Sequence, residues 1–270
     1  RGTREWLFGA VRAWIERDGA DVPKLLWVMG GAGTGKTTAS AELLRRLEGD
    51  RGESEGDEGS GSGSGADTLG GRAAAHHFFR HNDAATGDPV RLLVSLAAQL
   101  CLCVSGFEAA LDVGAVDAAL ASRKLGDVFD SVLRAPLERV EAPARTMVVV
   151  LDALDELPPA QLGVVLQLIV QRLALLPPWL RLFVTSRDTV QIKARLARFE
   201  PLELRIDEQR NREDVGAFLT RVARRYVAPK LSMAQIERIV EREFGIDLGG
   251  QLQALEEPMR QHTKIYERVV

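Results

Sequence analysis

The sequence has very few of the residues from which disulfide frameworks and zinc sites are built. It holds only two cysteines and four histidines in 270 residues. Cys101 and Cys103 lie in one apolar stretch and cannot form a disulfide framework, and the histidines are scattered without the spacing of a zinc site. We therefore expect a protein of a reducing compartment, the cytoplasm, without a structural zinc.

Strong net charge and long apolar runs are also lacking. The formal net charge is −3, which gives no electrostatic basis for binding nucleic acid. The most apolar stretch, 162–176, is shorter than a membrane span and contains two glutamines and an arginine. No signal peptide is recognisable. We expect no nucleic-acid partner and no membrane span. Because the chain does not begin with Met, we interpret it as a piece of a longer protein.

A glycine-rich segment, GGAGTGKT at Gly30–Thr37, fits the phosphate-binding pattern G-x-x-x-x-G-K-[ST] at every fixed position. An apolar run, Leu25–Met29, precedes it as a buried strand would, and apolar residues at helical spacing follow it. This strand–loop–helix context distinguishes a P-loop from a chance glycine-rich turn before a helix. The backbone N–H groups of such a loop surround phosphate oxygens, and the helix N-terminus adds partial positive charge.

The P-loop predicts which residues contact a nucleotide. Lys36 is expected to reach the β- and γ-phosphates, and the Thr37 hydroxyl to bind Mg²⁺. The predicted nucleotide-binding residues are Gly30, Gly31, Ala32, Gly33, Thr34, Gly35, Lys36, Thr37 and Thr38. ATP or ADP, with Mg²⁺, are therefore the expected cofactors.

A second motif lies far downstream. Met147–Leu151 is a valine-rich run typical of a strand buried on both faces, and it ends at Asp152. An Asp in that place is typical of a Walker B aspartate, which holds Mg²⁺ directly or through water. Asp155 and Glu156 follow within one short turn, where either is placed to polarise a water against the γ-phosphate. The alternative, an acidic start of the next helix, is weakened by the P-loop.

Strand and helix patterns alternate along most of the chain. The expected strands are 25–29, 73–79, 147–151, 181–185 and 202–206. Such alternation predicts a parallel sheet with helices on both faces and a ligand at the carboxyl ends of its strands. We expect an N-terminal helix leading into the core over 1–24, the core over 25–206 and a small helical lid domain over 207–270. The acidic and Gly/Ser-rich segment 49–71 is predicted to be a flexible linker within the core.

Several segments together resemble the NACHT family of STAND (signal-transduction) ATPases. They are Gly2–Leu7, Trp27–Met29, Ala39–Leu47, His76–Phe79, Ser95–Leu100, Asp152–Leu157 and Thr185–Arg187, within a resemblance that covers about residues 1–226. The family usually has Gly where this chain has Ala153. The resemblance implies an α/β P-loop NTPase fold of the ASCE type with strand order 5-1-4-3-2. It also implies that Arg187 is a sensor that meets the γ-phosphate.

The resemblance implies a function as well. Family members are molecular switches whose closed, ADP-bound form opens on ATP exchange and oligomerises to signal. For this chain it implies a slow, Mg²⁺-dependent ATPase with Glu156, Asp155 and Arg187 as catalytic residues. A homo-oligomer of the full-length protein is expected, with effector and repeat sensor domains outside this fragment. The winged-helix domain that usually follows is not identifiable before Val270, so the lid is expected to be truncated ahead of it.

Other functions stay open on the sequence. A remodelling or initiator ATPase of the AAA+ type shares the core and lid, but no residue stands out as an arginine finger. A module that uses ATP only for assembly, without hydrolysis, would show the same motifs. A GTPase is disfavoured because no Asn-Lys-x-Asp guanine-reading segment is found. The choice between Asp155 and Glu156 as the group that activates water is not decided, although Glu156 is weakly preferred.

Overall fold

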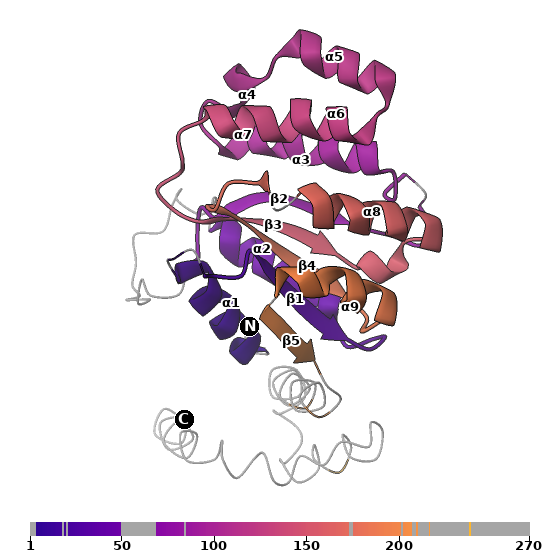
Figure 1. Cartoon of the computed structure of the whole chain (residues 1–270). Helices are drawn as coiled ribbons and strands as arrows, with labels where there is room; N and C mark the ends of the chain where they lie inside the picture. The colour runs from indigo at the N-terminus through magenta and orange to yellow at the C-terminus, as the bar shows by residue number, and fades with distance from the viewer. Residues whose placement is uncertain are drawn as a thin grey trace, which may run out of the picture. The chain divides into compact units, whose positions relative to one another are not determined.

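Five strands pair into one parallel sheet in the computed structural model of the chain (Figure 1). They are β1 (Leu25–Gly30), β2 (Ala73–Phe78), β3 (Met147–Asp152), β4 (Leu180–Ser186) and β5 (Leu202–Ile206). Their order is β2-β3-β4-β1-β5. Read from the other edge this is 5-1-4-3-2, so the predicted fold class and strand order are confirmed.

The structure describes residues 4–206 except 18, 20, 50–68, 84, 173, 174 and 201, and beyond them Gln209, Gly216 and Arg238. The chain divides into two units, Trp6–Ile206 and Arg1–Glu5 with Asp207–Val270, and the sheet belongs to the first. The lid expected over 207–270 lies outside the described residues, apart from the three named. Among the residues described, no helix has the length and hydropathy needed to cross a bilayer.

The three inner strands, β1, β3 and β4, are buried over their whole length. The sequences of β1 and β3 are near-continuous apolar runs because both faces of a parallel sheet are covered by helices. β4 also buries three polar residues, Arg181, Thr185 and Ser186. Successive side chains point to opposite faces, so β3 divides its valines and neighbours between two apolar clusters. Val148 and Val150 belong to one cluster, whereas Met147, Val149 and Leu151 belong to the other.

Helices cover the two faces unequally (Figure 1). On one face, the cluster with Val148 and Val150 contains α1 (Glu5–Glu16) and α2 (Lys36–Glu48). On the other lie α3 (Pro89–Cys103), α8 (Pro159–Arg172) and α9 (Val190–Leu196). On the latter face there is also a group of short helices that lie between α3 and β3 in the sequence. Its elements are α4 (Phe107–Ala110), α5 (Val113–Ser122), α6 (Leu125–Phe129), η1 (Asp130–Arg134) and α7 (Ala135–Arg139).

A buried arginine fixes the first helix to the sheet. Arg181, in β4, is only 5% exposed, and its guanidinium donates to the carbonyl oxygens of Trp14 and Arg17, the latter at 2.6 Å. These carbonyls lie at the C-terminus of α1, where a helix leaves acceptors unpaired and favours positive charge. The Trp14 indole N–H donates to the Pro23 carbonyl at 2.7 Å. The segment before β1 is therefore held at both the helix end and the loop.

The outer edge of β2 is covered by side chains of α3. The Gln99 amide accepts from the backbone N–H of His76 and donates to its carbonyl, both at 2.9 Å. One helical turn later, the Cys103 thiol donates to the Ala74 carbonyl at 3.0 Å. The Gln99 amide thus makes the pair of bonds that a neighbouring strand would make.

The expected linker returns to the core before its predicted end. Residues 50–68 lie outside the described residues, but Leu69 is 3% exposed and packs in the cluster of α1 and α2. The Arg72 N–H then donates to the Leu47 carbonyl at 2.9 Å. Chain entry into β2 is therefore tied to the end of α2.

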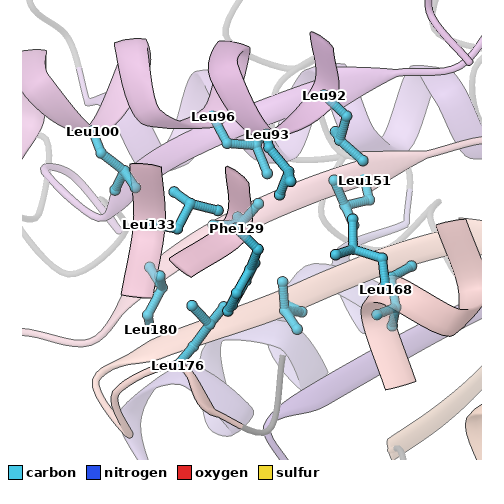
Figure 2. A pocket seen from close by; sticks show the side chains of 13 residues that line it. Leu92, Leu93, Leu96, Leu100, Phe129, Leu133, Leu151, Leu168, Leu176 and Leu180 are labelled. Atoms are coloured by element: carbon cyan, nitrogen blue, oxygen red, sulfur yellow. The ribbon is translucent and has the colours of Figure 1, made fainter. Parts of the chain in front are cut away.

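A small cavity lies inside the core, between α3, η1 and the sheet (Figure 2). Its volume is about 20 Å³, and all thirteen residues that line it are apolar. Leu92, Leu96, Phe129 and Leu133 point into it from the helical side in Figure 2. A cavity of this size without polar partners does not hold water. We interpret it as imperfect packing and not as a ligand site.

Filling this cavity should stabilise the protein. Val149 lines it from β3, whereas Val148, which is fully buried, points to the opposite face and does not line the cavity. Val149→Ile adds one buried methylene, which contributes about 0.8 kcal/mol of stability, while Val148→Ile should overpack and destabilise. Urea denaturation of the two variants measures the difference. Equal losses of stability in both would show that the cavity does not accept an added methyl group.

Candidate nucleotide-binding site

The glycine-rich loop joins the end of β1 to the start of α2. A Cβ at Gly30 would lie 2.5 Å from Oγ1 of Thr34, so a side chain at this position would force Thr34 to move. Thr34 itself is buried, and its hydroxyl donates to the Gly31 carbonyl at 3.0 Å. Gly35, the N-cap of α2, is left-handed at φ 72°, which also favours glycine. The predicted residues Gly31, Ala32 and Gly33 are exposed between them, as are Thr37 and Thr38 in the first turn of α2.

The side chain of Lys36 folds back on this loop. Its ammonium group donates to the carbonyl oxygens of Gly30 and Gly31, each at 2.8 Å. Burial lowers the pKa of Lys36; nearby Asp155 raises it and Arg187 lowers it. Lys36 is therefore close enough to Asp155, after β3, and to Arg187, after β4, for their charges to act on it. A phosphate group beside Lys36 would favour its charged form.

Asp152 ends β3 and connects three elements. Its carboxylate is 1% exposed, and it accepts hydrogen bonds from three hydroxyl groups: Thr37 at 2.7 Å, Ser40 at 2.6 Å and Thr185 at 2.6 Å. Thr37 and Ser40 lie one turn apart on α2, and Thr185 lies in β4. The predicted pair Thr37 and Asp152 is therefore brought together.

Two members of this network were not among the predicted site residues. Ser40 is fully buried although it is polar, and Thr185 is buried in β4. A serine three residues after Thr37, on the same side of a helix, was the available signal for Ser40. Thr185 belongs to the segment Thr185–Arg187 that resembles the NACHT family, and this position in the segment was the available signal for it.

Asp155 and Glu156 lie in the short 3-10 helix η2 (Leu154–Glu156) and have different partners. Both oxygens of Asp155 contact Arg187: Oδ1 accepts from its backbone N–H at 2.9 Å, and Oδ2 pairs with Nε at 2.9 Å. Oε2 of Glu156 accepts from the backbone N–H of His81 at 3.1 Å. Asp155 therefore holds the residue after β4, whereas Glu156 lies beside the loop after β2.

Ala153 adopts a conformation that alanine rarely takes. Its φ is 62° and its ψ is 47°, in the left-handed region. The chain turns sharply here between β3 and η2, and the Ala153 N–H donates to the Thr185 hydroxyl at 2.9 Å. A left-handed backbone costs a residue with a Cβ roughly 1–2 kcal/mol. This is the position at which the NACHT family usually has Gly, and the backbone provides the physical reason.

Removing this strain should stabilise the protein. Ala153→Gly relieves the steric cost but adds chain entropy to the unfolded state, so we expect a net gain of about 0.5–1 kcal/mol. Ala118→Gly, at an exposed right-handed position in α5, is the matched control and should cost about 1 kcal/mol. Thermal or urea denaturation gives both values. A loss of stability in Ala153→Gly would show that the turn does not strain alanine.

The predicted residues converge at one edge of the sheet, where its parallel strands end. The loop after β1, Asp152 at the end of β3 and Arg187 after β4 all lie there. Thr37 is hydrogen-bonded to Asp152, and Arg187 to Asp155. The charges of Asp155 and Arg187 both influence Lys36. This is the edge at which parallel α/β sheets bind ligands. The roles of these residues in binding or catalysis stay predictions.

A magnesium ion fits the donors present at this edge. The Thr37 hydroxyl and the Asp152 carboxylate are adjacent oxygen donors, and Thr37 is exposed. Mg²⁺ prefers oxygen ligands and is usually held by one or two protein groups together with nucleotide phosphates and waters. Among the described residues, no group of three or more His, Cys, Asp or Glu side chains is placed so that it could hold a metal ion. The donor set therefore suits a metal that arrives with a nucleotide better than a metal held by protein alone.

Fold and loop together define a nucleotide-binding domain of the P-loop NTPase type. The family model described as "Nephrocystin 3, N-terminal" matches residues 2–187, and the chain belongs to this family. That N-terminal region is a NACHT-like nucleotide-binding region, so the predicted resemblance is confirmed, although the family is not NACHT in the strict sense. A comparison with curated proteins gives no match.

Proposed function

We propose that this domain binds ATP with Mg²⁺, hydrolyses it slowly and acts as a nucleotide-dependent signalling switch. The observation that carries the proposal is the hydrogen bond between Thr37 and Asp152, 2.7 Å long. It places the hydroxyl of the P-loop helix beside the carboxylate at the end of β3, and these are the two groups that would hold a nucleotide-bound Mg²⁺. Membership of a NACHT-like family supports the same conclusion.

In this proposal, the loop and the N-terminus of α2 receive the phosphates. The exposed loop N–H groups and the helix dipole attract the negative charge. Lys36 exchanges its contacts with the Gly30 and Gly31 carbonyls for contacts with phosphate oxygens, which are stronger acceptors. Thr37 and Asp152 hold Mg²⁺, which neutralises phosphate charge when bound. Arg187, whose side chain is 57% exposed, contacts the γ-phosphate.

Glu156 is the better candidate for activating water. Both carboxylate oxygens of Asp155 are engaged by Arg187, so accepting a proton there would weaken the position of the arginine. The known partner of Glu156 is a backbone N–H, which leaves the carboxylate able to accept from a water as well. We therefore assign orientation and polarisation of the attacking water to Glu156, and the placement of Arg187 to Asp155.

The wider role follows from the NACHT likeness. We propose that exchange of ADP for ATP opens the full-length protein and drives its homo-oligomerisation in the cytoplasm. Effector and repeat sensor domains would supply its output and input. The nucleotide site is the part of this switch that the present chain contains.

Lys36→Ala should abolish most nucleotide binding without unfolding the domain. The variant removes the cation that faces the phosphates, so we expect ATP and ADP affinities to fall by about 10- to 100-fold. Isothermal titration calorimetry with each nucleotide, in the presence of Mg²⁺, measures both affinities. Lys193→Ala, at an exposed position in α9, is the matched control and should bind as the parent does. Parent-like affinity in Lys36→Ala would contradict the assigned site.

Glu156→Gln should separate binding from hydrolysis. The amide keeps the shape but cannot accept a proton, so single-turnover hydrolysis should slow by about 100-fold while ATP affinity stays near that of the parent. Asp155→Asn is the matched comparison, and its main defect should be in the preference for ATP over ADP.

Two outcomes would change this assignment. If Glu156→Gln hydrolyses ATP at the parent rate and Asp155→Asn is inactive, the catalytic role belongs to Asp155. If the parent binds ATP but shows no turnover, the assembly module without hydrolysis becomes the better description of this chain.

A further inference from the structure

Arg187 is fixed at its backbone as well as at its guanidinium. Its N–H donates to Asp155, as described, and its carbonyl oxygen accepts from the Ser186 hydroxyl at 2.8 Å and from the Thr189 N–H at 3.0 Å. Arg187 lies just beyond the end of β4, outside its regular strand pairing, so its backbone groups need such contacts to keep a single orientation. The Ser186 bond is the one that comes from inside the sheet.

The Ser186 hydroxyl is in turn held by a tryptophan on another strand. The indole N–H of Trp27 donates to Oγ of Ser186 at 2.8 Å, across 159 residues of sequence. Both residues are fully buried. Trp27 lies in β1, which pairs directly with β4 and leads into the P-loop.

The direction of these two bonds matters. A serine hydroxyl has one hydrogen and rotates to suit its partners, whereas an indole nitrogen can only donate. Because Trp27 donates to Oγ, the single hydrogen of Ser186 is directed away from it and toward the Arg187 carbonyl. Removal of the indole N–H would leave the hydroxyl free to rotate, and removal of the hydroxyl would leave the Arg187 carbonyl dependent on the Thr189 N–H.

We propose that Trp27, acting through the Ser186 hydroxyl, is a positioning residue for Arg187 and couples the strand that carries the P-loop to the contact with the γ-phosphate. This inference rests on the proposed function in so far as Arg187 meets the γ-phosphate. ADP has no γ-phosphate, so the effect of a misplaced Arg187 is confined to ATP. Trp27 and Ser186 therefore set the preference for ATP over ADP and leave the binding of the other phosphates to the loop.

The experiment measures ATP and ADP affinities of Ser186→Ala and Trp27→Phe by isothermal titration with Mg²⁺. Each variant should lose about three- to tenfold of its preference for ATP over ADP, as expected for one weakened phosphate contact, with ADP affinity within about twofold of the parent. In an Arg187→Ala background, Ser186→Ala should cause no further loss. Two variants are used because Trp27→Phe also removes core volume.

Val184→Ala is the matched structural control. Val184 is buried in β4 and lies opposite Trp27 in the sheet register, so its truncation loosens the same place without touching the polar chain. It should lower the melting temperature and keep the preference for ATP. The proposal is overturned if both test variants keep the parent preference. It is also overturned if Val184→Ala loses the preference equally, or if Ser186→Ala still lowers it when Arg187 is absent.

Hydrogen exchange of the nucleotide-free protein separates this inference from the proposed function. The Arg187 amide should exchange severalfold faster in Ser186→Ala and in Trp27→Phe than in the parent. The first variant lacks the Ser186 bond to the Arg187 carbonyl, and the second leaves that hydroxyl without its orienting donor, so in both the carbonyl depends on the bond from Thr189. Unchanged exchange would overturn the positioning role even if nucleotide bound normally. Failure of the proposed function would appear differently, as a parent protein that binds neither ATP nor ADP, and the exchange data would still decide the role of Trp27.

Discussion

The site depends on the buried carboxylate of Asp152. A carboxylate that is 1% exposed is costly to bury unless it is hydrogen-bonded. Three hydroxyl groups from two neighbouring elements, α2 and β4, supply those bonds. The bonds from Thr37 and Ser40 fix the start of α2 against the end of β3. The Thr185 hydroxyl also accepts a hydrogen bond from the Ala153 N–H, so it holds the backbone of the turn after β3 as well. The start of α2, the turn after β3 and the end of β4 are therefore held together by one carboxylate.

Strand β4 is the element that distributes this constraint. From one strand, Arg181 holds the end of α1, Thr185 holds Asp152, and Ser186 holds Arg187. It lies between β1 and β3, so it can contact both the P-loop strand and the strand that ends in Asp152.

The sequence alone predicted the parts of this arrangement that are local. The P-loop, the apolar strand ending at Asp152 and the alternation of strands and helices are patterns within short windows. The strand order came from the likeness to the NACHT family, and the structure confirms it. Side-chain pairings between distant residues could not be predicted from such windows. Ser40 with Asp152 spans 112 residues, and Trp27 with Ser186 spans 159, so only the folded sheet reveals them.

Neighbouring residues of one motif were also assigned incompletely. The sequence supported only a weak preference for Glu156 over Asp155 as the group that activates water. In the structure, after the left-handed turn at Ala153, the two acids have different partners: Asp155 contacts Arg187, and Glu156 contacts His81. A preference between two adjacent acids depends on backbone direction, and that direction is set by contacts from β4. The motif predicted two acidic side chains after β3, and only the tertiary structure shows which partner each of them contacts.

The cover that α3 places over β2 has a consequence for how this domain can join with others. Addition of a foreign strand at that edge would have to displace the Gln99 amide from His76 and the Cys103 thiol from Ala74. Both side chains come from one packed helix, so displacement would require the helix to move as a unit. The β2 edge is in this way protected from the strand-to-strand aggregation to which open sheet edges are prone. A reagent that alkylates Cys103 would remove its hydrogen bond to Ala74 and, with it, part of that protection.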